Sequence, residues 1–292
     1  MPELPEIETV ARGLARRAMG RRIVQVAVLH PGVVASPPET FAARVLGGTL
    51  ASVSRKGKVL AVELARAPGE SPFYLVVRLG MTGQLTVQNA NDPLEPHTHA
   101  RFSLDDGCEE IRFRDARRFG SLRCLTREEL DALFSRLGPD AQQVTKTEFF
   151  AATRGHRGAL KSWLMNQNQL AGLGNIYADE ALFAASLHPL TQPSRLSRGD
   201  AARLHKAVRA VLDRAIRLQG TSFRDYRDIE GRPGNFLPRL KVYGRTGEPC
   251  RRCRAMIRRI IVAGRSTHFC PHCQPRPRRA ATLSRRRLRK PA

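Results

Sequence analysis

The sequence has no long hydrophobic run: no stretch approaches roughly 18 uncharged apolar residues, which argues against a transmembrane helix and a membrane partner. The first residues, MPELPEIETV, carry acids where a secretory signal carries basic and then apolar residues, so we expect a cytoplasmic protein. No basic helix has a strongly apolar face for insertion into an anionic membrane. Acids are also few. The 26 Asp and Glu residues stand against 50 Lys and Arg, and the net charge of +24 attracts phosphate polyanions.

At 292 residues the chain is too long for one small core, and its hydrophobic period changes along the sequence. Residues 22–125 alternate or run apolar at strand length without intervening helices, which predicts an antiparallel β-sandwich. A helix follows at TREELDALFSRLG, where Thr126 and Glu129 are spaced as a capping box. From about Thr147 to Gln219 the period is helical, so we expect two or more domains.

Four of the six cysteines form a single pattern, Cys250-x2-Cys253-x16-Cys270-x2-Cys273. Two close pairs at this separation predict a zinc ribbon, in which two hairpin knuckles supply four thiolates. Disulfides are disfavoured in a cytosol. Because four sulfurs complete a tetrahedron, we expect one zinc ion with a structural role. Cys108 and Cys124 lie in strand-like segments and are expected to be buried.

The first ten residues admit two interpretations. Helix geometry explains Pro5, which suits the first helical position, and Glu6, which complements the helix dipole. It does not explain Pro2. Removal of the initiator Met would make Pro2 a free secondary amine, and an α-amine with a pKa of roughly 8 is a usable nucleophile near neutral pH.

The segment QLAGLGNIYADEALF places a glycine turn before a helix that Asn175 is expected to cap. Backbone N–H groups exposed at such a helix start suit a DNA phosphate. An ordinary helix–turn–helix corner is the alternative, and the basic charge of the chain favours phosphate.

The segment RFRDARRFG crowds arginines onto one strand and turn, next to Phe119. A basic strand beside an exposed aromatic suits a protein that holds a DNA backbone and wedges a base step. A solvated strand with Phe119 in the core is the alternative. Met81, between glycines in GMTG, is a second candidate wedge. The arginines are Arg112, Arg114, Arg117 and Arg118.

Taken in order, these motifs resemble those of formamidopyrimidine-DNA glycosylases. The matching segments are MPELPEIETV, GKVL, LGMTGQL, HTHARF, DARRFG, AGLGNIYADEALF, VYGRTGEPC and AGRSTHFCPHCQ. The resemblance runs from residue 1 to about residue 274. It implies an α+β multidomain fold, with an N-terminal antiparallel β-sandwich flanked by helices and a C-terminal helix–two-turn–helix domain with a β-hairpin zinc finger. The implied division is a catalytic domain at 1–136, a linker at 137–146, a helical DNA-binding domain at 147–240 with a lesion-capping loop at about 220–236 and a zinc hairpin at 241–274. Residues 275–292 exceed the usual family ending, and their many basic residues without any acid predict a basic, disordered tail.

The resemblance also implies roles for individual residues. Pro2 would attack the sugar C1′ and form a Schiff base, with Glu3 as proton donor. Lys58 and Arg265 match the proton donors for β- and δ-elimination, and Glu6 matches a second acid that we expect to orient the site. The implied activity is excision of oxidised purines, such as 8-oxoguanine and formamidopyrimidines, followed by cleavage of the abasic strand.

Implied DNA contacts come from several parts of the chain. Met81, Arg117 and Phe119 would fill the gap left by the flipped base, which offsets part of the cost of flipping. His156 is a departure from the family pattern, because this position usually carries a basic residue that contacts DNA. The expected DNA-binding residues are His97, Arg117, His156, Lys161 and Asn175.

Two other interpretations stay open. An endonuclease VIII-like glycosylase for oxidised pyrimidines shares the terminal proline, the glutamate and the zinc hairpin, although Leu4 and the candidate wedge residues favour the oxidised-purine branch. A noncatalytic DNA-binding protein on the same scaffold would not need the candidate nucleophile, acid and lysine. We expect a nucleoid-associated monomer that binds damaged double-stranded DNA, with nonspecific affinity added by the arginine-rich tail.

Overall fold

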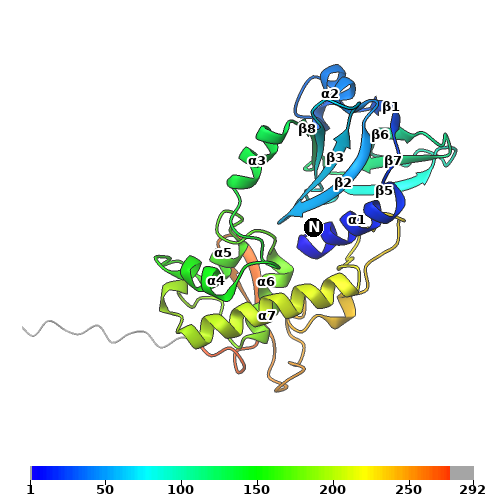
Figure 1. Ribbon diagram of the computed structural model, residues 1–292. Helices are drawn as coiled ribbons and strands as arrows, with labels where there is room; N and C mark the ends of the chain where they lie inside the picture. The colour runs from blue at the N-terminus through cyan, green and yellow to red at the C-terminus, as the bar shows by residue number, and fades with distance from the viewer. Residues whose placement is uncertain (1, 277–292) are drawn as a thin grey trace, which may run out of the picture.

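The N-terminal half of the molecule, seen here in a computed structural model, is a β-sandwich with helices packed around it (Figure 1). The structure describes residues 2–276. Each sheet has four strands, and every neighbouring pair is antiparallel. One sheet has the order β1 (Ile23–Val28), β6 (Thr98–Leu104), β7 (Glu109–Arg114), β5 (Gln84–Asn89), and the other has the order β2 (Thr49–Lys56), β3 (Val59–Ala65), β4 (Phe73–Arg78), β8 (Ser121–Leu125).

The predicted sandwich is confirmed, but two helical segments interrupt the region that was expected to contain strands alone. They are η1 (Pro31–Val33) and α2 (Pro38–Val45). Proline in the first turn of each suits a helix start, where the missing N–H group is not needed. Phe41 and Val45 of α2 are fully buried in the sandwich core, so packing stabilises a helix that is too short to be stable alone.

The helix α3 (Arg127–Ser135) leaves the sandwich with the predicted capping box. The N–H of Thr126 donates to the Glu129 carboxylate at 2.9 Å, and the N–H of Glu129 donates to the Thr126 hydroxyl at 3.3 Å. A segment with no helix or strand then leads to the C-terminal half.

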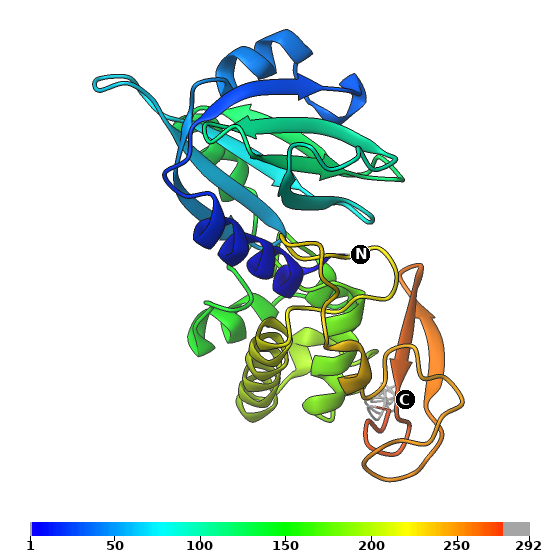
Figure 2. The same ribbon diagram turned by 90° about the vertical axis from the view of Figure 1, so that its right-hand side faces the viewer.

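The C-terminal half is helical and carries a separate β-hairpin (Figure 2). Its core is built around Trp163 and Tyr177 from two successive helices. The hairpin of β9 and β10 projects from one side and carries the cysteine knuckles at its base. The elements are α4 (Lys146–Thr153), α5 (Leu160–Met165), α6 (Asn175–Ala184), η2 (Pro193–Arg195), α7 (Arg198–Arg217), η3 (Leu237–Arg239), β9 (Arg258–Val262) and β10 (Arg265–Phe269).

The helix α1 (Leu4–Arg17) packs against both halves. Leu4 belongs to the helical core, whereas Ile7 and Val10 belong to the sandwich core. The loop after α7 also returns to the sandwich, where Ile229 is fully buried. The two halves are therefore joined by shared core residues as well as by the chain. The prediction that Cys108 is buried was wrong, because it lies exposed in the turn before β7.

Within residues 2–276, none of the helices has the length and apolar character that a membrane crossing would need.

Candidate active site and nucleic-acid interface

The carboxylate of Glu3 lies against the start of α6. The N–H groups of Gly174 and Ile176 donate to its two oxygens at 2.6 and 2.9 Å, and Glu3 is only 1% exposed. N–H groups at a helix start carry partial positive charge and stabilise an anion. The N–H groups that were predicted to hold a DNA phosphate are thus occupied by Glu3, and the N-cap residue is Gly174 and not Asn175.

Lys58 approaches the same glycine from the turn between β2 and β3. A methyl group added to Gly174 would lie 2.4 Å from the Glu3 carboxyl carbon and 2.7 Å from the Lys58 Nζ. Burial lowers the pKa of Lys58, and the charge of Arg265 lowers it further, while Glu3 and Glu6 act in the opposite direction. An ammonium group made more acidic in this way gives up its proton more readily than an ordinary lysine.

Glu6 lies behind Glu3, on the first turn of α1. Its carboxylate accepts the N–H groups of Glu3 and Thr221, each at 2.7 Å, and the hydroxyl of Tyr177. Burial, and secondarily the charge of Glu3, raise the pKa of Glu6 to about 7. Because Glu6 bonds directly to the Glu3 backbone, its contacts fix the direction in which the terminus enters the site.

A cavity of about 240 Å³ opens beside these groups. Pro2 is buried and lines this cavity together with Lys58, Gly80 and Phe119, so the candidate nucleophile, the lysine and one candidate wedge share one space. Gln167, from the turn after α5, lines the cavity on the side of the helical half. The structure brings together residues that are more than 100 positions apart in the sequence.

The loop that carries Phe119 presents an aromatic ring to solvent. Phe119 is 58% exposed, and the Arg117 guanidinium lies 4.7 Å from its ring centroid, so the alternative that placed Phe119 in the core was wrong. The buried Asp115 organises this loop. Its carboxylate accepts the N–H groups of Gly120 at 2.7 Å and Arg117 at 3.3 Å, and the hydroxyl of Thr82. Thr82 in turn neighbours Met81, which is half-buried.

One arginine of the basic strand faces inward, although the sequence predicted that the strand presents its arginines to DNA or to solvent. Arg112 is 2% exposed, pairs with Glu110, and donates to the carbonyls of Asp92 at 2.8 Å and Pro93 at 3.0 Å. It therefore holds the loop before β6 and does not face DNA. That loop ends at His97, which is exposed in a left-handed conformation with φ of 67°.

The predicted DNA contact by Lys161 is also corrected. Lys161 is fully buried, and its ammonium group pairs with Asp179 and donates to the Asn175 carbonyl at 3.0 Å. Asp179 in addition accepts the N–H of His268 on β10 at 2.9 Å. Lys161 thus links α5, α6 and the hairpin, and its ammonium group is already paired inside the protein. Sequence reasoning passed over Asp179, although an acid within the apolar stretch NIYADEALF is itself a signal of a buried ion pair.

The remaining predicted contacts come from the helical half and its hairpin. Arg265 is exposed at the start of β10, and His156 is half-buried in the segment before α5. Asn175 is half-buried, and its side-chain oxygen has no partner among the described residues. Their contacts with DNA stay predictions.

The four predicted cysteine ligands meet at the base of the hairpin. Their sulfur atoms all lie within 4.8 Å of one another, with Cys253 and Cys270 at 3.4 Å and Cys250 and Cys273 at 4.0 Å. A tetrahedral site with Zn–S bonds of about 2.3 Å requires sulfur separations of roughly 3.8 Å. The donor set and its spacing therefore fit one structural zinc ion.

The structure thus combines an antiparallel β-sandwich, a buried Pro2, a helical C-terminal half and a Cys₄ hairpin, which are the parts expected from the resemblance to formamidopyrimidine-DNA glycosylases. Family models agree with this over most of the chain. The formamidopyrimidine-DNA glycosylase N-terminal domain matches residues 1–122, the H2TH domain of the same enzymes matches 137–227, and the zinc finger found in FPG and IleRS matches 247–276.

Curated relatives and solved structures extend the agreement. A formamidopyrimidine-DNA glycosylase from Symbiobacterium thermophilum is 44% identical, over 99% of this chain and 94% of its own length. One from Heliobacterium modesticaldum is also 44% identical, over 94% of this chain and all of its own length. A Lactococcus lactis Fpg, solved in complex with DNA that contains an abasic site, superposes with a TM-score of 0.86 at 34% identity, covering 94% of this chain and 100% of its own.

The chain belongs to the formamidopyrimidine-DNA glycosylase family. The Symbiobacterium match, at 99% of the chain, extends into the basic tail, whereas the sequence resemblance ended near residue 274.

Proposed function

We propose that this protein excises oxidised purines from double-stranded DNA and then cleaves the abasic strand, with Pro2 as the nucleophile. The observation that carries this proposal is that Pro2 and Lys58 line one cavity, while the Glu3 carboxylate and the Lys58 ammonium both lie against Gly174. Relatives named as formamidopyrimidine-DNA glycosylases, and Lactococcus lactis Fpg complexes with Fapy-dG and abasic-site DNA, support the choice of substrate.

In the proposed reaction the Pro2 nitrogen, freed of Met1, forms a bond to C1′ while the bond from C1′ to the damaged base breaks. The base leaves with the electron pair of that bond and takes a proton from water. Glu3 takes the proton that the Pro2 nitrogen loses and passes it to O4′ as the sugar ring opens. The product is an iminium ion, whose fixed positive charge draws electrons from C2′. Loss of the C2′ proton then expels the 3′ phosphate, and a second elimination expels the 5′ phosphate.

The other residues support this chemistry in the same proposal. Lys58 and Arg265 donate protons during β- and δ-elimination, Glu6 orients Glu3, and the zinc hairpin holds Arg265 near the strand. Met81, Arg117 and Phe119 occupy the gap in the duplex, where Arg117 donates to the orphan cytosine. The protein would act as a monomer on the DNA of the nucleoid, in the cytoplasm.

Borohydride trapping tests the proposal directly, because reduction of the iminium ion fixes the enzyme to DNA covalently. We expect a stoichiometric adduct with an 8-oxoguanine or abasic duplex, and no adduct for a Pro2→Gly variant. Mass spectrometry of the adduct should locate the bond at residue 2. Full activity in a preparation that retains Met1 on every molecule would contradict the mechanism and leave a noncatalytic DNA-binding protein.

A second candidate function is excision of oxidised pyrimidines. It is favoured by one observation: a Lactococcus lactis Fpg, which superposes with a TM-score of 0.85, was solved with DNA containing an oxidised pyrimidine. A trapping panel on duplexes with 8-oxoguanine, a formamidopyrimidine, an oxidised pyrimidine or an abasic site separates the two. Faster trapping on the pyrimidine lesion would favour the endonuclease VIII-like activity.

A further inference from the structure

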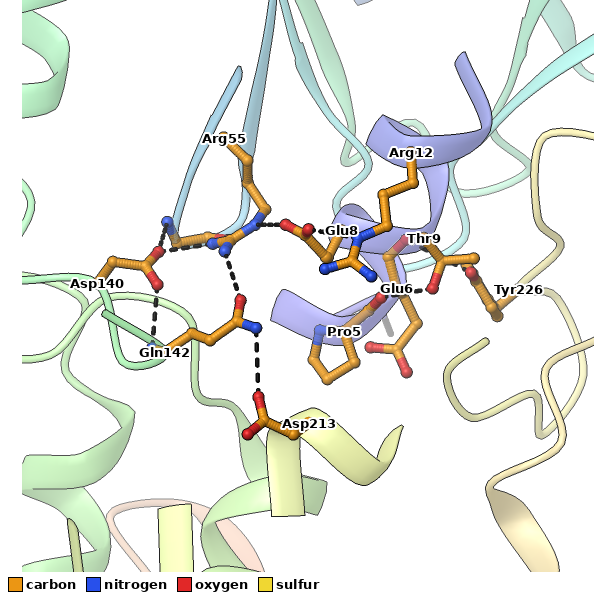
Figure 3. A network of polar contacts seen from close by, with 11 residues as sticks. Pro5, Glu6, Glu8, Thr9, Arg12, Arg55, Asp140, Gln142, Asp213 and Tyr226 are labelled. Atoms are coloured by element: carbon orange, nitrogen blue, oxygen red, sulfur yellow. Dashed lines mark hydrogen bonds and ion pairs between the residues drawn. The ribbon is translucent and has the colours of Figure 1, made fainter. Parts of the chain in front are cut away.

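The turn that carries Lys58 is held by a buried carboxylate from the segment that joins the two halves of the molecule. Asp140 accepts the N–H of Gly57 at 2.8 Å and the Arg55 guanidinium at 2.6 Å (Figure 3). The side chains of Arg55 and Asp140 are 4% and 6% exposed. Such a pair is not explained as a simple stability device, because buried ion pairs often add little net stability.

Arg55 extends the same network to the helix that carries the N-terminus. Its Nε donates to Glu8 on α1 at 2.8 Å, and its second amino group donates to Gln142 at 3.2 Å (Figure 3). The side-chain amide of Gln142 in turn donates to the Asp213 carboxylate on α7 at 3.3 Å. Through Arg55, the turn before Lys58 is therefore connected both to α1, which begins directly after Glu3, and to the helical half.

The segment around Asp140 also reaches the turn that binds Glu3. The N–H of Ala141 donates to the Ala171 carbonyl, and the N–H of Ala171 donates to the Pro139 carbonyl, both at 2.9 Å. Gly57 packs directly on Ala171, since a methyl group at Gly57 would lie 2.8 Å from the Ala171 Cβ. Ala171 comes three residues before Gly174. Asp140 thus lies between the turn that carries Lys58 and the turn that holds the Glu3 carboxylate.

We propose that Asp140, acting through Arg55 and the Gly57 N–H, is a positioning residue that sets the Lys58 ammonium against Glu3. This inference rests on the proposed function. Lysine has a flexible four-carbon stem, so the location of its ammonium group depends on how firmly the backbone at its base is held. A purely structural role is the alternative, in which Asp140 only neutralises the buried Arg55.

The two roles predict different cleavage rates for a double variant that carries substitutions at both Asp140 and Lys58. The test measures single-turnover cleavage of a preformed abasic duplex by the wild type, Asp140→Asn, Lys58→Ala and the double variant. Asparagine keeps the shape of the side chain, but its amide nitrogen faces donors where a carboxylate oxygen accepted. A displacement of about 1 Å can cost on the order of a hundredfold in rate, so we expect Asp140→Asn to lose about 10- to 100-fold. In the Lys58→Ala background the same change should cost less than about twofold, because the group it positions is gone.

Losses that multiply in the double variant would overturn the proposal, and so would a full rate for Asp140→Asn. If Asp140→Asn does not fold, Arg55→Met removes the other member of the ion pair and answers the same question. The decrease in rate caused by Arg55→Met should likewise disappear in the Lys58→Ala background. The matched control is Asp131→Asn, which breaks an ion pair with Arg127 on α3 whose side chains are 61% and 62% exposed, and which should keep the wild-type rate.

The same series separates failure of this inference from failure of the proposed function. If the wild type gives no borohydride adduct, the proposed function fails. If the wild type gives the adduct and the losses multiply, only the positioning role fails. Affinity for a duplex with a tetrahydrofuran abasic analogue, which cannot form the iminium ion, should be unchanged in Asp140→Asn, whereas a displaced domain interface would weaken it.

Discussion

The Gly174 N–H donates to the Glu3 carboxylate at 2.6 Å across 171 residues of sequence, and this bond fixes the candidate acid at the start of α6. It exists only because residue 174 has no side chain. A Cβ at this position would lie 2.4 Å from the Glu3 carboxyl carbon, and real Cβ contacts are never so short. The glycine in this turn is thus required by the close approach of the Glu3 carboxylate and the Lys58 ammonium group.

Gly174→Ala should therefore impair catalysis strongly. The added methyl group must displace Glu3 and Lys58 together, and we expect the rate of base excision to fall about 100-fold or more, with a loss of roughly 1–3 kcal/mol in unfolding free energy from overpacking. Single-turnover excision and urea denaturation measure the two effects. Gly158→Ala is the control, because nothing lies within 4 Å of a Cβ there, and both quantities should stay near wild type. Normal excision by Gly174→Ala would contradict the site geometry.

Glu6 should make stability depend on pH near neutrality. Burial raises its pKa from 4.5 to about 7, so the folded state holds a proton that the unfolded state has released. The stabilisation that protonated Glu6 gives to the folded state is complete below pH 4.5. It is lost as the pH rises toward 7, and the total loss of unfolding free energy is roughly 3 kcal/mol. Denaturation of the wild type and Glu6→Gln from about pH 4.5 to 8 should show the variant gaining relative stability with pH. A constant difference would rule this out.

Phe119→Ala should separate base excision from folding. Because the ring is 58% exposed, its loss should change the unfolding free energy by less than about 0.5 kcal/mol. A wedge that offsets part of the few kcal/mol needed for base flipping should instead affect excision, which we expect to fall about 10- to 100-fold. Cleavage of a preformed abasic site should fall less. Val24→Ala on β1, 46% exposed, is the control, and equal losses on both substrates would argue against a wedge.

Deletion of residues 275–292 should flatten the salt dependence of DNA binding. This tail carries eight basic residues and no acid, and all but its first two residues lie outside the described residues. Each phosphate contact contributes about 0.9 to the slope of log K against log salt. Binding measured at several salt concentrations tests this, with a tail of equal length whose basic residues are replaced by Gln as a second variant. An unchanged slope would refute a DNA-binding role for the tail.

The elements that sequence predicted well are those set by local pattern. The strand alternation, the capping box at Thr126 and the cysteine spacing each depend on residues close in the sequence, and all three are confirmed. Glycosylase family membership was also predicted, because motifs such as AGLGNIYADEALF are long and specific. The errors concern partners that only the fold supplies.

Three residues illustrate those errors. The basic run predicted that Arg112 faces DNA, and the family resemblance placed Lys161 there, yet both side chains are buried. Arg112 donates to the carbonyls of Asp92 and Pro93 in the loop before β6, and Lys161 pairs with Asp179 from the next helix. The start of α6 appeared open to phosphate, but Glu3 takes its N–H groups from the opposite end of the chain. A cation or a helix end does not reveal its partner, since that choice depends on tertiary packing.

Because Leu4 and Ile7 enter different cores within a single turn of α1, the two halves cannot be exchanged between relatives as independent modules. A chimera that takes its front half from another member of the family inserts a foreign residue 4 into the recipient's helical half. Residue 4 directly follows Glu3. If its side chain does not fit the recipient's helical core, both halves of the hybrid can fold while Pro2 and Glu3 are misplaced, and the hybrid would then be inactive.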